Sequence, residues 1–110
     1  MVENMVKRLS PIQVKNILES EAQIKLIDVR ERWEYQIASL ENAELVPLGD
    51  FVNFSRSLNP KEKIIIYCHH GARSFNACSY LEQNGFNEVI NLEGGIDAWS
   101  REIDNSIPVY

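Results

Sequence analysis

Residues 64–74 read IIIYCHHGARS, and this stretch shows best how the chain folds. Three isoleucines and a tyrosine follow one another without any polar interruption, which is typical of a strand buried on both faces of a parallel sheet. The apolar run ends at Cys68, and Gly71 follows after two histidines. We therefore expect a strand that turns through a glycine into a helix, with a thiol at the turn.

Short apolar segments alternate with helical patterns along the rest of the chain. Ser10 and Pro11 suit a helix start, because serine caps helix N-termini and proline fits the first turn. Strands that alternate with helices predict an α/β fold of three layers (α/β/α), with a parallel sheet between two layers of helices. Further helices are predicted at residues 31–36, 48–58, 74–84 and 96–103, and strands at residues 25–29, 44–47, 63–67 and 88–91.

Three apolar side chains and a pair of glycines are assigned structural roles. Trp33 and Ile37 are expected to anchor the helix at residues 31–36 against the core, and Trp99 to pack rather than to bind a ligand. Gly94 and Gly95 are expected to form the turn that begins the last helix.

Composition limits the class of protein. The 110 residues are 45% hydrophobic and 25% charged, which suits one globular domain over residues 1–110. A net charge of −5 argues against a nucleic-acid partner and against a polybasic membrane anchor. Residues 1–6 do not resemble a signal peptide, and no apolar run approaches the ~20 residues that span a bilayer, so we expect a cytoplasmic protein.

The loop after the apolar run has the features of an anion site with a nucleophile. Backbone N–H groups at a helix N-terminus favour an anion, and a thiolate of Cys68 is an anion. Gly71 permits the tight turn, and Arg73 adds a fixed positive charge. His69 and His70 can donate hydrogen bonds, but either can equally be a solvated loop residue. Cys68 is therefore predicted to be a nucleophile.

The second cysteine is expected to be structural. Cys78 shares an apolar helical stripe with Phe75 and Leu81, which predicts core packing. A disulfide with Cys68 would need Cα atoms within ~7 Å, and a loop residue paired with a core-facing helical residue does not favour this. The histidines directly beside Cys68 lack the spacing of zinc ligands, so no metal site is predicted.

Asp28 and Arg30 lie at the end of the strand predicted at residues 25–29. A carboxylate there can orient an active-site group, but such a pair more often ties loops together by hydrogen bonds. We favour a supporting, structural role for both, although Arg30 can also steer an anionic substrate.

Three motifs together resemble the single-domain members of the rhodanese family of sulfurtransferases. Residues 26–35, LIDVRERWEY, are similar to the first signature of that family. Residues 67–74, YCHHGARS, resemble its active-site loop, Cys-x-x-Gly-x-Arg. Residues 89–99, VINLEGGIDAW, resemble its closing signature, Leu-x-Gly-Gly-x-x-x-Trp. The resemblance covers nearly the whole chain.

This resemblance implies five parallel strands in the order 1-5-4-2-3 and a thiosulfate sulfurtransferase that needs no cofactor. Cys68 would take the outer sulfur of thiosulfate or of another persulfide-type donor and become a persulfide. Cyanide, a cellular thiol or a sulfur-accepting protein would then receive that sulfur. The persulfide anion would be bound by the backbone N–H groups of His69, His70, Gly71, Ala72 and Arg73.

The sequence also departs from the family and leaves alternatives open. Residues 38–43, ASLENA, stand where family members commonly carry Gly-His-Ile-Pro-Gly-Ala, so no role of that histidine carries over to Ser39. Phosphatases of this fold use Cys-x5-Arg, whereas Cys68 and Arg73 are separated by four residues, which suits sulfur better than a phosphoryl group or arsenate. A persulfide carrier or binding module that serves a protein partner stays open as the main alternative.

Overall fold

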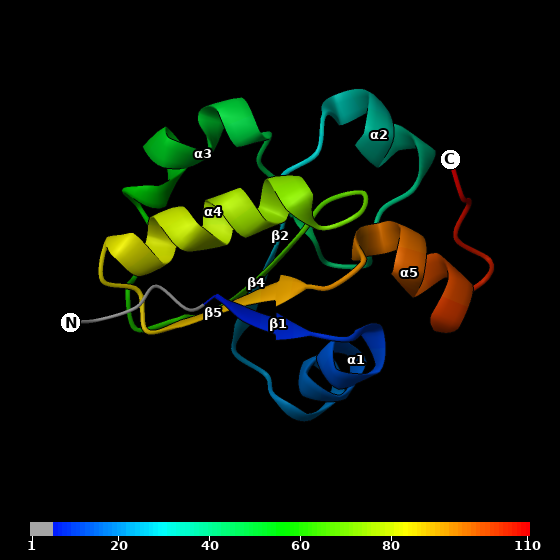
Figure 1. The fold of residues 1–110 in the computed structure, drawn as a ribbon, viewed down its shortest axis with the longest axis horizontal. Coiled ribbons are helices and arrows are strands. Elements are labelled where there is room, and N and C mark those ends of the chain that lie inside the picture. Colours follow the sequence, from blue (N-terminus) through cyan, green and yellow to red (C-terminus); the bar gives the residue numbers. More distant parts are fainter. Residues whose placement is uncertain (1–5) are drawn as a thin grey trace.

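The computed structural model describes residues 6–110 (Figure 1). The signal-peptide prediction rests almost entirely on residues 1–5, which lie outside this range. None of the helices within residues 6–110 combines the length and the apolar character of a bilayer-spanning helix. The elements, in chain order, are β1 (Lys7–Leu9), α1 (Pro11–Ser20), β2 (Ile24–Asp28), α2 (Arg32–Ile37), β3 (Glu44–Leu45), α3 (Leu48–Ser55), β4 (Lys63–Tyr67), α4 (Ala72–Gln83), β5 (Glu88–Leu92) and α5 (Gly95–Glu102).

The strands form one parallel sheet in the order β1-β5-β4-β2-β3, so the strand order implied by the resemblance is confirmed. The apolar run that ends at Tyr67 is the central strand, and it pairs with β2 on one side and β5 on the other. The residue pattern did not predict β1. That strand has only three residues, two of them exposed, and lies at the sheet edge, so it lacks the apolar signal of a buried strand.

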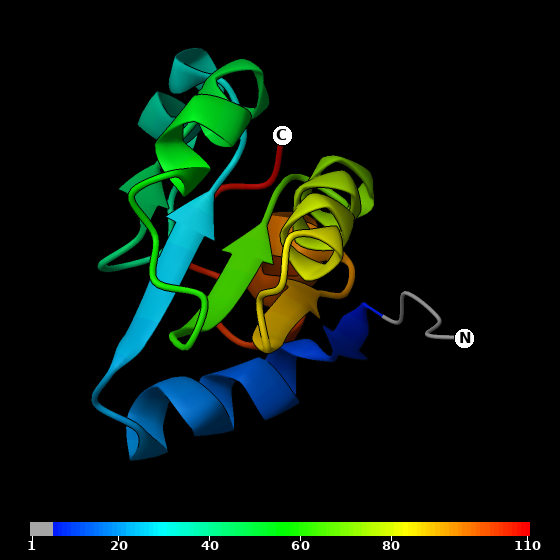
Figure 2. The same cartoon turned by 90° about the vertical axis from the view of Figure 1, so that its left-hand side faces the viewer.

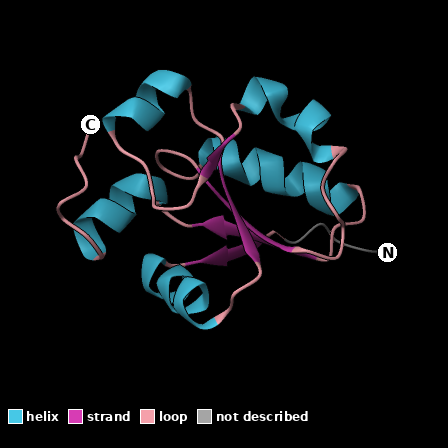
Figure 3. Cartoon of the chain, turned by 180° about the vertical axis from the view of Figure 1, so that it is seen from behind, coloured by secondary structure: helices cyan, strands magenta, loops and turns pink. Residues whose placement is uncertain are grey.

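Helices cover both faces of the sheet, which confirms the predicted three-layer α/β fold (Figure 2). α3 and α4 pack together on one face, and α1 and α5 pack together on the other (Figure 1). After α5 the chain turns back, and its C-terminal segment ends near α2 (Figure 3). All the strands run in the same direction, so the loops after β2, β4 and β5 gather at the carboxyl edge of the sheet.

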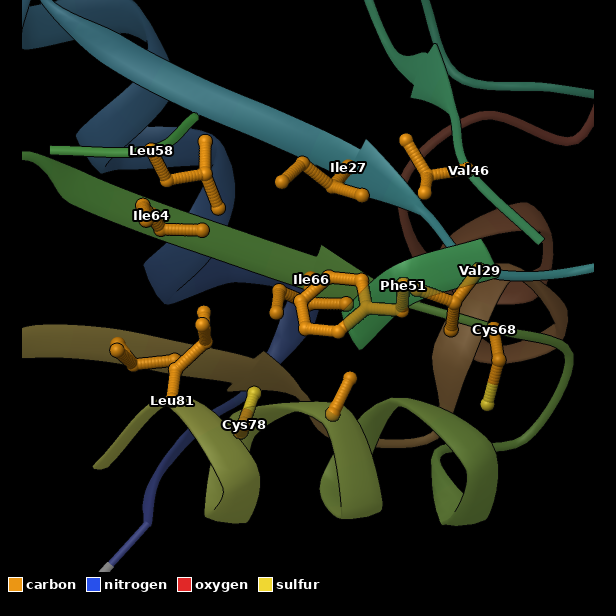
Figure 4. Packing of buried hydrophobic residues seen from close by; sticks show 12 residues of the cluster. Ile27, Val29, Val46, Phe51, Leu58, Ile64, Ile66, Cys68, Cys78 and Leu81 are labelled. Carbon is orange, nitrogen blue, oxygen red and sulfur yellow. The ribbon is translucent and has the colours of Figure 1, made fainter. Parts of the chain in front are cut away.

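The core lies on both sides of the sheet because successive strand residues point to opposite faces. In β4, Ile64 and Ile66 join the cluster under α3 and α4, whereas Ile65 and Tyr67 join the cluster under α1 and α5. The first cluster is drawn in Figure 4 and includes both cysteines. Cys78 packs there beside Leu81, as the apolar stripe predicts.

The prediction that Trp33 and Ile37 anchor α2 against the core is wrong. Trp33 is 58% exposed and Ile37 is 43% exposed, and the buried residue of this helix is Glu34. Hydrophobicity alone points to the wrong face because Glu34 pairs with Arg73 of α4, which offsets the cost of burying its charge. Trp99, in contrast, is half-buried and packs against the cluster under α1 and α5.

Candidate active site

Cys68 follows β4 and is buried beneath the loop that leads into α4, with 1% of its surface exposed. Its Sγ accepts hydrogen bonds from the backbone N–H groups of Gly71, at 3.1 Å, and Ser74, at 3.4 Å. Gly71 adopts a φ of +111°, a conformation that favours glycine, directly before the first turn of α4. The sulfur therefore lies at a helix N-terminus, where the exposed N–H groups favour a negative charge.

Two polar side chains that the sequence analysis did not select also support the sulfur. The hydroxyl of Ser74 lies 3.3 Å from Sγ and 2.5 Å from Oδ1 of Asn91, which belongs to β5. Nδ2 of Asn91 donates to the carbonyl oxygen of Gly71 at 3.1 Å. A hydroxyl has one proton to donate, so Ser74 can bond the thiolate only when it is not donating to Asn91. This arrangement holds the loop in place and leaves a proton donor beside the sulfur.

The N-terminus of α5 holds the other side of the loop. The N–H of Ile96 donates to the carbonyl oxygen of Cys68 at 2.9 Å, and that of Asp97 donates to the carbonyl oxygen of His69 at 3.1 Å. Gly95, with φ of +63°, lies so close that a Cβ there would overlap both carbonyl groups. Gly95 therefore does more than form the expected turn, because it lets α5 approach the active-site loop.

Replacing Gly95 by Ala is expected to cost on the order of 3 kcal/mol of folding free energy, because the new Cβ adds overlap to an unfavourable φ. Urea unfolding monitored by circular dichroism measures this cost. Gly85→Ala is the matched control, since Gly85 also has a positive φ, of +88°, but open space around it. Equal costs for the two variants would contradict the proposed packing of Gly95 against the loop.

Arg73, predicted as a positive group of the loop, is paired with a carboxylate. Its Nη1 and Nη2 donate to Oε1 and Oε2 of Glu34 at 2.7 and 2.9 Å. This bidentate pair lowers the pKa of Glu34 to about 2, against the opposing effect of burial. The pKa of Arg73 is raised, chiefly by Glu34 and to a smaller extent by Cys68. The side chain of Arg73 is still 36% exposed, but its charge is balanced.

The Glu34–Arg73 pair predicts a loss of stability in acid. The pKa of Glu34 is about 2 in the folded protein and near 4.5 as the ordinary value, so its contribution is complete above pH ~4.5 and lost as the pH falls toward 2. Urea unfolding from pH 6 to pH 2.5 should show wild type losing about 3 kcal/mol more than Glu34→Gln, which has no proton to take up there. Identical pH dependence in the two proteins would rule out this pairing.

Asp28 and Arg30 form a fully buried pair behind the loop. Nε and Nη2 of Arg30 both donate to the Asp28 carboxylate, and Nη2 also donates to the carbonyl oxygen of Ala38 at 2.6 Å. Burial disfavours the charge of Arg30, but hydrogen bonds with Asp28 and Tyr110 outweigh this and raise its pKa. The pair ties the loop after β2 to the segment after α2. Burial leaves Arg30 no surface on which to meet a substrate.

The two histidines differ in environment. The ring of His69 is stacked between the rings of His70 and Tyr110, each with its centroid 3.9 Å away. Burial lowers the pKa of His69. The side chain of His70 is 66% exposed, and its Nε2 lies 3.9 Å from Oδ2 of Asp97. His70 therefore faces solvent, whereas His69 is part of the packing of the loop.

These histidines and Asp97 do not form a suitable metal site. Their ligand atoms lie within 4.8 Å of one another, the one such group of three found within residues 6–110. A metal lies in the plane of each imidazole that binds it, yet the two rings are stacked with only 28° between their planes. Asp97 is also already paired with Arg101 at 3.0 Å.

A hollow of about 450 Å³ borders the loop, lined by residues that include His70, Gly71, Ala72 and Phe75. Arg8 of β1 contributes a cation to this hollow and lies over the Phe75 ring, 4.7 Å from its centroid. A larger hollow, of about 640 Å³, lies at the opposite ends of the strands and contains neither cysteine. Of these two hollows, only the smaller one borders the loop that follows Cys68.

Residues 10–102 match the family model of the Rhodanese-like domain. The chain belongs to the rhodanese-like family. Its relatives include the putative sulfurtransferase YtwF of Bacillus subtilis, 33% identical over 88% of this chain and 93% of that protein. A sulfurtransferase of Allochromatium vinosum is 35% identical over 88% of this chain and 91% of its own length. Both are single-domain proteins of similar size, so the resemblance to single-domain rhodaneses is confirmed.

A further relative and a solved structure extend the comparison. The Rhodanese-like/PpiC domain-containing protein 12 of Arabidopsis thaliana is 40% identical over 78% of this chain, but the match spans only 30% of that protein. The crystal structure of a rhodanese-like domain protein from Staphylococcus aureus superimposes with a TM-score of 0.80 at 30% identity, covering 96% of this chain and 99% of that one. The chain thus has the rhodanese-like fold over nearly all of its described residues. The relatives support sulfur transfer as the class of chemistry.

Four residues at the site were missed from the sequence: Glu34, Ser74, Asn91 and Tyr110. The first three lie within the three sequence motifs that resemble the family signatures, and this position could have identified them as candidate site residues. Tyr110 lies outside all of these signatures and has no local pattern that connects it to the loop.

Proposed function

We propose that this rhodanese-like domain transfers sulfane sulfur through a persulfide on Cys68. The observation that carries the proposal is the position of Sγ at the N-terminus of α4, where it accepts N–H hydrogen bonds from Gly71 and Ser74. These donors favour a thiolate, which is the nucleophilic form of cysteine. Sulfurtransferase relatives of similar length support the same class of reaction.

In the proposed first step, the Cys68 thiolate attacks the outer sulfur of thiosulfate. A bond forms between Sγ and that sulfur, the sulfur–sulfur bond of thiosulfate breaks, and sulfite leaves with the electron pair. A small-molecule persulfide can replace thiosulfate as the donor, and a thiolate then leaves instead of sulfite. We expect the backbone N–H groups of residues 69–73 to bind the terminal persulfide sulfur and to stabilise its negative charge.

In the second step, an acceptor attacks the terminal sulfur, and the bond to Sγ breaks to regenerate the thiolate. Cyanide gives thiocyanate, and a thiol gives a new persulfide. The sulfur atom is transferred to and from Cys68 as sulfane sulfur, and the protein returns to its starting oxidation state. The scheme therefore requires no redox cofactor. Two free cysteines suit the reducing cytoplasm, where we place the protein.

The test is the intact mass of the protein after reaction with thiosulfate and removal of excess reagent. We expect a gain of one sulfur atom, located by peptide mapping to the peptide with Cys68, and an equal gain in Cys78→Ala. Burial raises the pKa of Cys78, so that thiol is expected to stay unmodified. A protein that gains no sulfur from thiosulfate or from a small-molecule persulfide is not a sulfurtransferase of this kind.

A carrier that delivers the persulfide to a protein partner is the second candidate. It is favoured by the exposed apolar side chains of Trp33 and Ile37 on α2, the helix whose Glu34 binds Arg73 of the loop. A carrier would take up sulfur at Cys68 but return it slowly to cyanide. Rapid multiple turnover with cyanide or a simple thiol would identify the enzyme instead.

A further inference from the structure

Tyr110 connects the end of the described chain to the active-site loop. Its ring stacks on that of His69 with centroids 3.9 Å apart and planes only 5° from parallel. The segment before it is fixed as well, because the hydroxyl of Ser100 in α5 donates to the carbonyl oxygen of Ile107, which packs against the core. The C-terminal segment that carries Tyr110 is therefore held against the core, and this fixes the position of the ring that stacks on His69.

The hydroxyl of Tyr110 joins the two ion pairs that flank the loop. It donates to Oε2 of Glu34 at 2.8 Å and accepts from Nη1 of Arg30 at 2.8 Å. Glu34 is the carboxylate that holds Arg73, and Arg30 is the cation buried with Asp28. Burial raises the pKa of Tyr110 to about 12, so this hydroxyl keeps the proton that it donates. One side chain thus completes a continuous network from the buried pair to the loop.

We propose that Tyr110 is a positioning residue for the sulfur-transfer loop. Its ring packs against the ring of His69, while Gly95 and the N-terminus of α5 contact the backbone of His69. Its hydroxyl keeps Glu34, and through it Arg73, in one orientation. The inference rests on the proposed function, because the loop that Tyr110 positions is the one that would bind the persulfide.

This role has a specific chemical consequence. The N–H groups of a loop stabilise a developing charge only when they are already aimed at it before the reaction. A loop with His69 released on one side has more conformations, and misplacement by even 1 Å can cost up to ~100-fold in rate. We therefore expect Tyr110 to affect the rate at which Cys68 takes up sulfur without contacting the sulfur itself.

The experiment measures the rate of sulfur uptake from thiosulfate by quenched mass spectrometry, at a temperature where all variants are folded. We expect Tyr110→Ala to be slower than wild type by about tenfold. Tyr110→Phe keeps the ring but loses the hydroxyl, and we expect its rate to lie between those of wild type and Tyr110→Ala. Val109→Ala is the matched control from the same segment; its side chain is half exposed, and we expect the wild-type rate.

A second readout follows the His69 ring by proton NMR titration in wild type and in both Tyr110 variants. A hydrogen bond with the backbone of Tyr110 raises the pKa of His69, and both variants keep that backbone group. His70, Asp97 and Glu34 are the other titratable side chains that influence His69, and neither variant changes them. Removing the Tyr110 ring exposes His69, so its midpoint should rise toward the usual ~6.5 in Tyr110→Ala but stay low in Tyr110→Phe.

The two readouts separate this inference from the proposed function. Wild-type uptake in Tyr110→Ala, or a His69 midpoint that does not move in that variant, overturns the positioning role while leaving sulfur transfer intact. Failure of wild type itself to take up sulfur overturns the proposed function and, with it, the catalytic consequence of the positioning role. The His69 midpoint still decides whether Tyr110 holds the ring.

Discussion

Replacing Cys68 by Ser is expected to abolish sulfur transfer, with turnover at least about 1,000-fold below that of wild type. A serine hydroxyl is not ionised at neutral pH and cannot form a persulfide, so the first step has no nucleophile. The smaller side chain fits the same space, and the N–H groups of Gly71 and Ser74 can donate to its oxygen instead. The fold is therefore expected to survive, which circular dichroism checks.

The reciprocal control is Cys78→Ala. Cys78 is buried among apolar side chains under α4, so its removal leaves a small cavity and lowers stability. Turnover with thiosulfate and cyanide should remain within about twofold of wild type, because the thiol takes no part in the proposed steps. Substantial activity in Cys68→Ser, or a large loss of turnover in a folded Cys78→Ala protein, would show that the nucleophile has been assigned to the wrong cysteine.

Removing the carboxylate of Asp28 is expected to destabilise the fold strongly. Asp28→Ala leaves the guanidinium of Arg30 buried without its counter-charge, which costs about 3–5 kcal/mol. For a chain of this size, that corresponds to a fall in Tm on the order of 15 °C or more. Differential scanning calorimetry measures the change directly.

Glu19→Ala provides a matched control for the loss of a carboxylate. Glu19 pairs with Lys15 on the exposed side of α1, at 2.8 Å, and such surface pairs contribute below about 1 kcal/mol. Comparing the stability losses of Asp28→Ala and Glu19→Ala separates the effect of burying an ion pair from the effect of removing a negative charge. If the two substitutions cost the same, the buried pair is not the main tie between the loop after β2 and the segment that follows α2.

The fold could be predicted because the strongest signals were local. The uninterrupted apolar run before Cys68 became the central strand, and glycine at position 71 marked the turn into α4. The same local logic placed Cys68 at a helix N-terminus. It failed for β1, whose short exposed edge carries no apolar signal, and for α2, whose buried residue is charged.

What could not be predicted at the site depends on distant partners. The burial of Glu34 makes sense only once Arg73, 39 positions away, is placed beside it. Tyr110 is 80 positions from Arg30 and 76 from Glu34, and no periodic pattern relates residues so far apart. The position of Gly95 against the loop likewise follows from the packing of α5 rather than from the Gly-Gly turn itself.

The close approach of Gly95 limits how far the backbone of the active-site loop can shift toward α5. The carbonyl groups of Cys68 and His69 are fastened to α5 and have a neighbouring backbone directly behind them. A longer loop, such as the Cys-x5-Arg loop of phosphatases, would therefore have to expand on the side away from α5, or α5 would have to move with it.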